Sequence, residues 1–169
     1  HTHTTYTHGT STIEENVRQA ENLGLKYIAI TEHSYNSIYH IKHGDLDKMR
    51  QDIDDIKNKY KPKILLGIEA NLISRNGDLD ISDSELIGLD LVILGFHKMT
   101  KVKLKEWFKF VLPNIIRKKP TKKQIETNTE AYLNAIEKHR ISIIAHLNYA
   151  GCYEKKKKIA KACAEKGIY

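Results

Sequence analysis

Cysteine is scarce in this sequence. Its two thiols, Cys152 and Cys163, do not form a Cys-x-x-Cys pair. A disulfide scaffold or a zinc ribbon needs more cysteines at closer spacing, so the sequence excludes both. We interpret the two thiols as incidental residues of a protein in a reducing cytoplasm.

Long apolar runs are also missing, and none approaches the roughly 18 residues of a membrane-spanning helix. No signal-peptide pattern opens the sequence, and no internal repeat or low-complexity linker divides it. We therefore expect a cytoplasmic protein without a membrane partner. With 40% hydrophobic and 29% charged residues, a chain of 169 residues can form one globular domain with a sizeable core.

Positive charge is concentrated in one segment. Residues 98–123 contain ten Lys or Arg and a single acid, Glu106, whereas the net charge of the whole chain is +7. Apolar residues at helical spacing predict a short amphipathic helix within this segment: Leu104, Trp107, Phe108 and Val111. Pro113 and Pro120 bracket its exit. The segment is either a surface helix packed on the domain or a binding surface for nucleic acid, an anionic membrane or phosphorylated substrates.

Helix and strand patterns alternate along the chain. Ser11 and Thr12, each with a Glu three residues later, predict a capping box that opens a helix, and Gly24 ends it. β-rich runs predict strands at 25–31, 63–68, 90–96 and 141–145, and periodic stretches predict helices at 45–59, 124–138 and 154–166, with a short helical turn from Ser82. This alternation favours a single-domain α/β fold with parallel strands.

Each of the four predicted strands is followed by a residue that can bind a metal ion. These residues are His33, Glu69, His97 and His146. The carboxyl ends of parallel strands meet at one edge, where the active sites of such folds lie. His1 and His3 share one face of an extended segment, and His8 follows in the next loop. Seven ligands are too many for one tetrahedral ion, so we predict two or three divalent ions.

Three further residues near this edge could contact a substrate. His40 and His43 lie in the polar loop after His33, and Arg50, on the next predicted helix, could bind a phosphate with its guanidinium fork. For each of the three, a role as an ordinary solvated surface residue explains the sequence about as well as a substrate contact. His139, at a predicted helix end, is expected to be exposed.

The ligands occur in a characteristic order of short motifs. They are His1-Thr-His3-Thr, His8-Gly, Ile-Thr-Glu-His33, Gly-Ile-Glu69-Ala-Asn, Gly-Phe-His97 and Ile-Ala-His146, with Ser-Thr-Ile-Glu, Asn76-Gly-Asp-Leu-Asp80 and Thr127-Asn-Thr129. Along nearly its whole length the sequence resembles the PHP (polymerase and histidinol phosphatase) superfamily, and most closely its small bacterial phosphatases of the YcdX type. The resemblance implies a distorted seven-stranded (β/α) TIM-like barrel with a trinuclear metal site at the strand ends.

The resemblance also divides the ligands among three ions. Glu69 would bridge the first and second ions, and the histidines would act in pairs: His1 with His3, His97 with His146, and His8 with His33. We assign catalysis to Glu69 and His97. Zinc is the first choice of metal, with manganese or iron as alternatives, since all three accept these ligands.

The sequence departs from the family pattern in several places. It ends before the family's Asp-x-His motif, which supplies two ligands, and it begins with His1. We therefore expect residues 1–169 to be one PHP catalytic domain that is cut at both ends. Glu32 stands where Asp is usual, Lys98 where an acid is common, and His146-Leu-Asn148 replaces His-Pro-Gly-Asn. The last two changes affect the substrate pocket.

The implied reaction is hydrolysis of a small phosphate monoester by a hydroxide that bridges metal ions. Three alternatives remain open: phosphodiester cleavage on nucleic acid, which only the basic segment supports, histidinol-phosphate hydrolysis, and a structural metal-binding module without catalysis. Open coordination positions would separate the last from an enzyme. The substrate, the metal and the oligomeric state do not follow from the sequence.

Overall fold

A parallel sheet lies at the centre of the computed structural model, which describes residues 1–116, 119–152 and 155–169. The strands lie in the order β1 (Tyr27–His33), β2 (Lys63–Asn71), β3 (Leu91–Gly95) and β4 (Ile143–Ile144). All neighbouring pairs are parallel, which confirms the predicted α/β class. The four strands in the described part of the chain form an open sheet, so the closed barrel stays a prediction.

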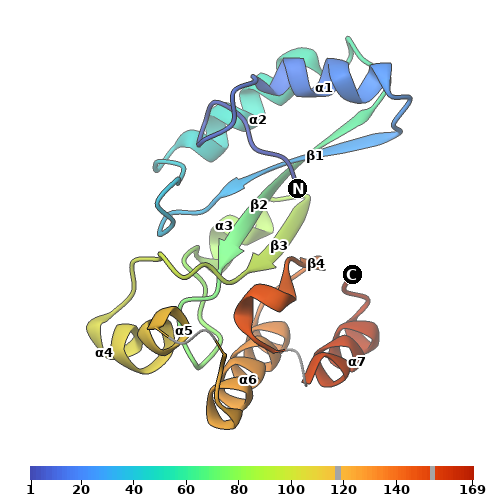
Figure 1. Ribbon diagram of the computed structural model, residues 1–169. Helices are drawn as coiled ribbons and strands as arrows, with labels where there is room; N and C mark the ends of the chain where they lie inside the picture. The colour runs from blue at the N-terminus through green and yellow to red at the C-terminus, as the bar shows by residue number, and fades with distance from the viewer. Residues whose placement is uncertain (117–118, 153–154) are drawn as a thin grey trace.

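Helices connect the strands and pack beside them. They are α1 (Ile13–Asn22), α2 (Asp45–Ile56), α3 (Asp83–Ile87), α6 (Lys122–Lys138) and α7 (Lys156–Lys166). Helices α1 and α2 lie together near β1 and β2, whereas α6 and α7 lie together at the β4 end (Figure 1). The predicted capping box is confirmed at Thr12, whose hydroxyl accepts from the Glu15 N–H. The predicted start of the last helix, at residue 154, lies outside the described residues.

The strand ends differ from the predicted ones. We expected the first strand to end at Thr31, but its pairing with β2 continues through His33, which lies opposite Glu69. Each further pair adds backbone hydrogen bonds, so the two predicted ligand positions belong to the sheet itself rather than to the loops after it. Strand β3 ends at Gly95, and β4 is confined to Ile143–Ile144, shorter than predicted.

Both edges of the sheet have further hydrogen-bonded partners. Next to β1, the Thr31 N–H donates to the Thr2 carbonyl at 3.0 Å, so the N-terminal segment runs beside this strand. Next to β4, the Tyr169 N–H donates to the Ser142 carbonyl at 3.0 Å, and the Ile144 N–H donates to the Tyr169 carbonyl at 2.7 Å. This alternation of bonds is that of a parallel strand.

Apolar side chains of the sheet and the helices form one core. Fully buried members include Ile30, Ile68 and Leu94 from the strands, Val17 and Met49 from α1 and α2, and Tyr132 from α6. At roughly 1.5–3 kcal/mol for each fully buried large apolar side chain, this core is the main favourable contribution to folding. It holds the strand ends, and therefore the predicted ligands, in place.

The basic segment forms a helix, as predicted, but the helix is longer than expected, and Leu104 and Phe108 of its predicted apolar face are not buried. It consists of α4 (Leu104–Glu106), the π-helical turn η1 (Trp107–Val111) and α5 (Leu112–Ile116). Pro113 lies inside it rather than at its exit. Proline lacks an N–H and its ring crowds the carbonyl four residues earlier, which accounts for the wider π turn before it.

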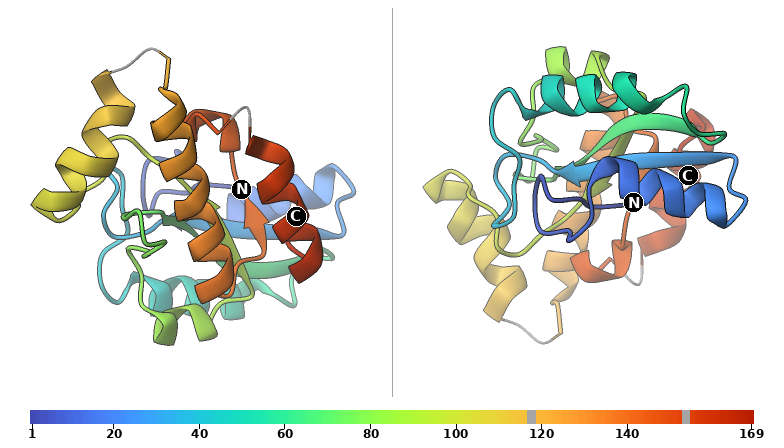
Figure 2. Two further views of the ribbon diagram at one scale, coloured as in Figure 1. Left: turned by 90° about the horizontal axis from the view of Figure 1, so that it is seen from below. Right: turned by 90° about the horizontal axis from the view of Figure 1, so that it is seen from above.

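The amphipathic helix stands at one edge of the molecule (Figure 2). Phe110 and Val111 pack into the core, whereas Leu104 and Phe108 are exposed. Arg117 and Lys118, which belong to the predicted basic segment, lie outside the described residues. Among the helices of the described ranges, none is long and apolar enough to cross a membrane.

Candidate metal centre

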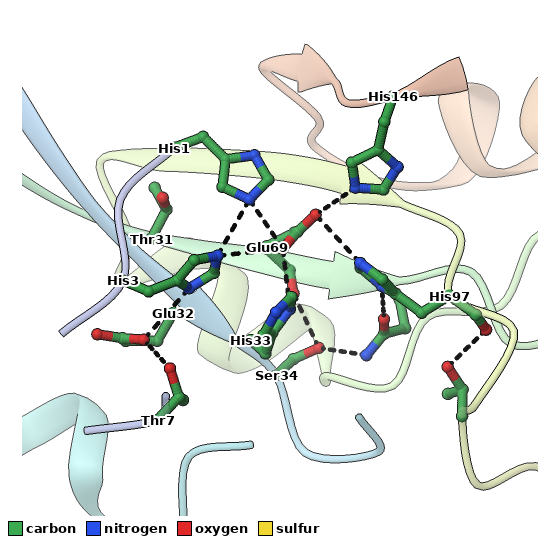
Figure 3. A network of polar contacts seen from close by, with 12 residues as sticks. His1, His3, Thr7, Thr31, Glu32, His33, Ser34, Glu69, His97 and His146 are labelled. Atoms are coloured by element: carbon green, nitrogen blue, oxygen red, sulfur yellow. Dashed lines mark hydrogen bonds and ion pairs between the residues drawn. The ribbon is translucent and has the colours of Figure 1, made fainter. Parts of the chain in front are cut away.

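The carboxylate of Glu69 lies at the centre of a cluster of imidazole rings (Figure 3). This side chain is completely buried. Its Oε1 lies 2.7 Å from His146 Nε2 and 3.4 Å from His97 Nε2, and its Oε2 lies 2.8 Å from His33 Nδ1, 3.0 Å from His1 Nε2 and 3.8 Å from His3 Nε2. Five of the six predicted histidine ligands thus surround one carboxylate.

The sheet topology brings these residues together. His33, the last residue of β1, is the register partner of Glu69 within β2, so their side chains lie next to each other on the same face. His97 follows β3. His146 follows β4 with a left-handed backbone (φ 30°), which no other non-glycine residue in the described ranges shares. Such strain is typical of functional positions.

His8, the sixth histidine, lies at the outer side of the cluster. Its ring centroid is 4.5 Å from that of His3 and 5.2 Å from that of His33. Three sets of ligand atoms, each within 4.8 Å of one another, could hold an ion: His3, His8 and His33; His1, His3 and Glu69; and His33, Glu69 and His97. His33 occurs in two of them, so the predicted division of ligands among ions stays a prediction.

Two buried atoms of the cluster lack hydrogen-bond partners, which bears on whether a cation fits between them. His33 Nδ1 and Glu69 Oε2 lie 2.8 Å apart, yet their geometry forms no hydrogen bond, and both are buried without a hydrogen-bond partner. Leaving such atoms unpaired costs about 1–3 kcal/mol each. Nitrogen and carboxylate oxygen atoms are the ligands that zinc and related ions take, so a divalent ion fits the donor set.

The environment sets the charge of the cluster. Burial opposes ionisation of Glu69, but its contacts with His1, His146 and His33 outweigh burial and hold its pKa far below the ordinary value. Burial lowers the pKa of His97 to about 4. At neutral pH His97 is therefore uncharged and has a nitrogen lone pair for a metal ion.

Glu32 supports the cluster from the opposite face of β1. Its carboxylate accepts from the Thr4 N–H and hydroxyl, each at 2.5 Å, and from the Thr7 hydroxyl, and it lies 3.4 Å from His3 Nδ1. A carboxylate on the second nitrogen of a ligating histidine fixes the ring orientation and directs the other nitrogen to the metal. The sequence analysis did not foresee this contact of Glu32 with His3.

Asn71 and Asp80 form a second support behind His97, which sequence reasoning also missed. The Asn71 side-chain oxygen makes a short hydrogen bond with His97 Nδ1, and the Asn71 amide donates to Asp80 Oδ2 at 2.5 Å. Both residues belong to the motifs Glu69-Ala-Asn and Asp-Leu-Asp80. Because both residues belong to motifs that the sequence analysis had already quoted, this membership was the signal that could have indicated their supporting role.

The predicted substrate residues do not join the cluster. His40 Nδ1 donates to the Ser37 carbonyl at 2.9 Å, and the His43 ring stacks on Tyr35 with centroids 4.3 Å apart. Their loop reaches the cluster instead through Tyr39, whose ring centroid is 5.0 Å from that of His8.

Arg50 points elsewhere, since it donates to Asp90 at 3.1 Å and to the Gly88 carbonyl at 3.0 Å, and these contacts do not favour a role in phosphate binding. His139 was expected to be exposed, and this was wrong: its ring is only 12% exposed and bonds to Asp83 at 2.7 Å. The turn of the 72–79 hairpin, which lies far from α6 in sequence, covers it through the Gly77 carbonyl at 3.1 Å.

A lysine and a tyrosine form the rim beside His97 and His146. Lys98 Nζ lies 4.8 Å above the Tyr149 ring, and this ring is 6.2 Å from that of His146. Lys98 is half-buried, and the salt bridges of the described residues give it no carboxylate partner. The rim therefore carries a positive charge next to the ligands.

The fold is that of an α/β domain whose predicted metal ligands gather near the carboxyl ends of its strands. The chain belongs to the PHP domain family, which matches residues 1–168. It is 28% identical over 204 residues to a probable phosphatase of Clostridium acetobutylicum, with 99% of this chain and 73% of the relative covered.

Two further relatives have the same description. A probable phosphatase of Caldanaerobacter subterraneus is 32% identical over 152 residues, covering 86% of this chain and 50% of the relative. A probable phosphatase of Shewanella sp. (strain ANA-3) is 31% identical over 172 residues, covering 99% of this chain and 58% of the relative. The chain thus spans between half and three quarters of the length of these relatives.

Proposed function

We propose that this chain is the metal-binding part of a phosphatase that hydrolyses small phosphate monoesters with a multinuclear divalent metal centre. The observation that carries the proposal is the buried Glu69 carboxylate, which has imidazole nitrogens of five histidines within 3.8 Å. The descriptions of the relatives as probable phosphatases agree with it.

The open side of the cluster supports an enzyme over a structural metal module. The side chains of His1 and His146 are each 36% exposed, although Glu69 between them is completely buried. A substrate phosphate would therefore reach ions held by Glu69 from the side of these two histidines. Structural metal sites are closed by protein ligands, whereas catalytic ones keep a position for water or substrate.

The residues of this chain would act by binding the divalent ions and by orienting the anionic substrate beside them. Divalent ions, once bound, supply a water of pKa about 7 and positive charge for the phosphate oxygens. Glu69 offers one oxygen to each half of the cluster and so suits a bridging position. His97, uncharged at neutral pH, offers its Nε2, and Lys98 can bind an anionic group of the substrate at the rim.

We further propose that the four strands belong to the seven-stranded barrel implied by the family resemblance. The hydrogen bonds of Thr2 along β1 and of Tyr169 along β4 support further strands at both edges. A later strand with the family's Asp-x-His motif would complete the coordination of the ions, and the domain of residues 1–169 would then be incomplete. A crystal structure of the intact protein tests this, and anomalous scattering identifies the number and element of the ions.

Phosphatase assays of the intact, metal-loaded protein on a broad panel of phosphate monoesters test the main proposal. Replacement of Glu69 or His97 by Ala should abolish the activity that zinc, manganese or iron restores. Matched controls are Glu137→Ala and His139→Ala, which lie outside the cluster and should retain activity. Unchanged activity of Glu69→Ala would rule out the proposed site.

A second candidate is phosphodiester cleavage on nucleic acid. The exposed Phe108 and the lysines around it on the amphipathic helix favour it, because aromatic and basic side chains together bind single strands. Binding of a labelled oligonucleotide should then weaken linearly in log–log plots as salt rises. Absence of binding at low salt would remove this candidate. Histidinol phosphate belongs in the monoester panel as a specific substrate to be tested.

A further inference from the structure

Asp80 lies at the centre of a buried hydrogen-bond network that ends at His97. Its Oδ2 accepts from the Asn36 N–H at 3.0 Å and from the Asn71 amide at 2.5 Å. Its Oδ1 accepts from the Asn71 N–H at 2.8 Å and from the Ser34 hydroxyl at 2.5 Å. Every neighbour of this carboxylate in the network is a donor, as a carboxylate acceptor requires.

The network determines the orientation of the Asn71 amide. The NH₂ group faces Asp80 Oδ2, and it also lies 3.2 Å from Ser34 Oγ. The reverse orientation would place the amide oxygen of Asn71 against the carboxylate oxygen of Asp80, so two acceptors would face each other. The amide oxygen of Asn71 must therefore point the other way, toward His97 Nδ1.

The orientation of Asn71 in turn determines where His97 carries its proton. An oxygen acceptor at Nδ1 requires the proton on Nδ1, which leaves a lone pair on Nε2. That Nε2 lies 3.4 Å from Glu69 Oε1. Two ligand atoms on one tetrahedral ion, each about 2.1 Å from it, are separated by about 3.4 Å, so this pair is spaced to share a cation.

We infer that Asp80 is a positioning residue of the metal centre, which acts through Asn71 to hold His97 in the tautomer that presents Nε2 to the metal. Asp80 makes no direct contact with His97, and it reaches this histidine through the Asn71 amide. The inference rests on the proposed function only in taking His97 as a metal ligand.

The His97 tautomer can be measured directly in the metal-free intact protein. Long-range ¹H–¹⁵N correlation spectra distinguish an imidazole protonated on Nδ1 from one protonated on Nε2. The unaltered protein should show the Nδ1–H form for His97. Asp80→Asn permits either amide orientation, so we expect mixed His97 tautomers and a zinc affinity lower by about 10- to 100-fold in calorimetric titration.

An exchange variant separates positioning from mere structural support. Asn71→Asp combined with Asp80→Asn keeps an oxygen acceptor at His97 Nδ1 and a donor–acceptor pair behind it. It should restore the Nδ1–H tautomer, and its zinc affinity should exceed that of Asp80→Asn but stay below that of the unaltered protein, because the NH₂ group at position 80 faces the Asn36 N–H. The matched control is Asp90→Asn, a carboxylate that bonds Arg50 and the Leu66 N–H away from the cluster.

Three results would overturn the inference. An Nε2–H tautomer in the unaltered protein overturns the inference, as does an Asp80→Asn variant that keeps both tautomer and zinc affinity. If Asp80→Asn does not fold, the tautomer of the unaltered protein decides, and loss of the Nδ1–H form in a folded exchange variant also overturns the inference. A protein with the expected tautomer and zinc affinity but without phosphatase activity would refute the proposed function alone.

Discussion

His33 and Glu69 are the last residues that pair between β1 and β2, and their side chains bring Nδ1 and Oε2 to 2.8 Å. The contact follows from the parallel register, because residues opposite each other project from the same face of the sheet. Both atoms are buried and make no hydrogen bond. A cation between the ligands would satisfy both atoms.

Replacement of Glu69 by Gln should remove the charge at the centre of the cluster while keeping its shape. The amide can offer only one oxygen where the carboxylate offers two, and its NH₂ group would face the ring nitrogens of His97 and His146 or those of His1 and His33. Because Glu69 would bind the proposed ions directly, we expect zinc affinity to fall by more than about 100-fold.

Calorimetric titration and metal analysis of the dialysed protein measure this effect. Glu137→Gln, an exposed residue of α6, is the control and should bind zinc like the unaltered protein. Equal zinc content in the Glu69→Gln variant would mean that the carboxylate is not a ligand.

The positions of the predicted ligands followed from local patterns, whereas their supports did not. Alternating apolar strands and helices predicted that Glu69 and His97 would meet at one edge of a sheet, because parallel strands align their carboxyl ends. The contact of Glu32 with Thr4 depends on a loop 28 residues away. The orientation of Asn71 depends on Asp80 across a hairpin. Such pairings require the fold, because no sequence periodicity encodes them.

The metal-free protein should become less stable as the pH falls from about 6.5 to about 4. Burial lowers the pKa of His97 from 6.5 to about 4, so between these values the unfolded chain binds a proton that folded His97 does not. The unfolded state is therefore favoured progressively as the pH drops through this range, and the stability is fully present above it.

The variant His97→Gln isolates this contribution. His1 has the opposite effect, since its contact with Glu69 raises its pKa, and it remains in the variant. Urea unfolding from pH 7 to pH 4 should give a flatter pH dependence for His97→Gln than for the unaltered protein. His139→Gln serves as the control, and a slope unchanged by His97→Gln would contradict the expectation.

Glu32→Gln should destabilise the fold and loosen His3. Burial opposes the charge of Glu32, but hydrogen bonds from His3, Thr4 and Thr7 outweigh it and lower the pKa. An amide NH₂ in this site would face donors, at a cost of about 1–3 kcal/mol in the free energy of unfolding. Zinc affinity should fall by about 10- to 100-fold because His3 is no longer oriented.

Thermal unfolding and zinc titration measure the two effects of Glu32→Gln. The conservative variant Glu32→Asp keeps the charge and should lose less of both. If Glu32→Asp proves as damaging as Glu32→Gln, the length of the side chain rather than its charge is what matters.

Lys98→Gln should weaken substrate binding without affecting the chemical step. The ammonium lies at the rim above Tyr149 and outside the ligand cluster. Charge-assisted hydrogen bonds contribute about 1.5–3 kcal/mol, so KM for a phosphate monoester should rise by about tenfold or more, with kcat nearly constant. Steady-state kinetics of Lys98→Gln beside Lys101→Gln test this, and a fall in kcat alone would place Lys98 in a different role.

Gly95 leaves space that the cluster needs. A Cβ at this position would lie 2.9 Å from Glu69 Oε1 and 3.1 Å from the Cε1 atoms of both His97 and His146. Glu69 cannot move aside freely, because histidines hold both of its oxygens. Gly95→Ala should therefore displace ligands while the rest of the sheet keeps its packing.

A displacement of about 1 Å at a reacting centre can cost about 100-fold in rate, so Gly95→Ala should lose most phosphatase activity and bind zinc more weakly. Its circular dichroism should match that of the unaltered protein. Gly88→Ala is the matched control, since the nearest atom to its added Cβ is the Glu85 carbonyl oxygen at 3.6 Å. Full activity and zinc binding in Gly95→Ala would show that the ligands do not crowd this glycine in the working protein.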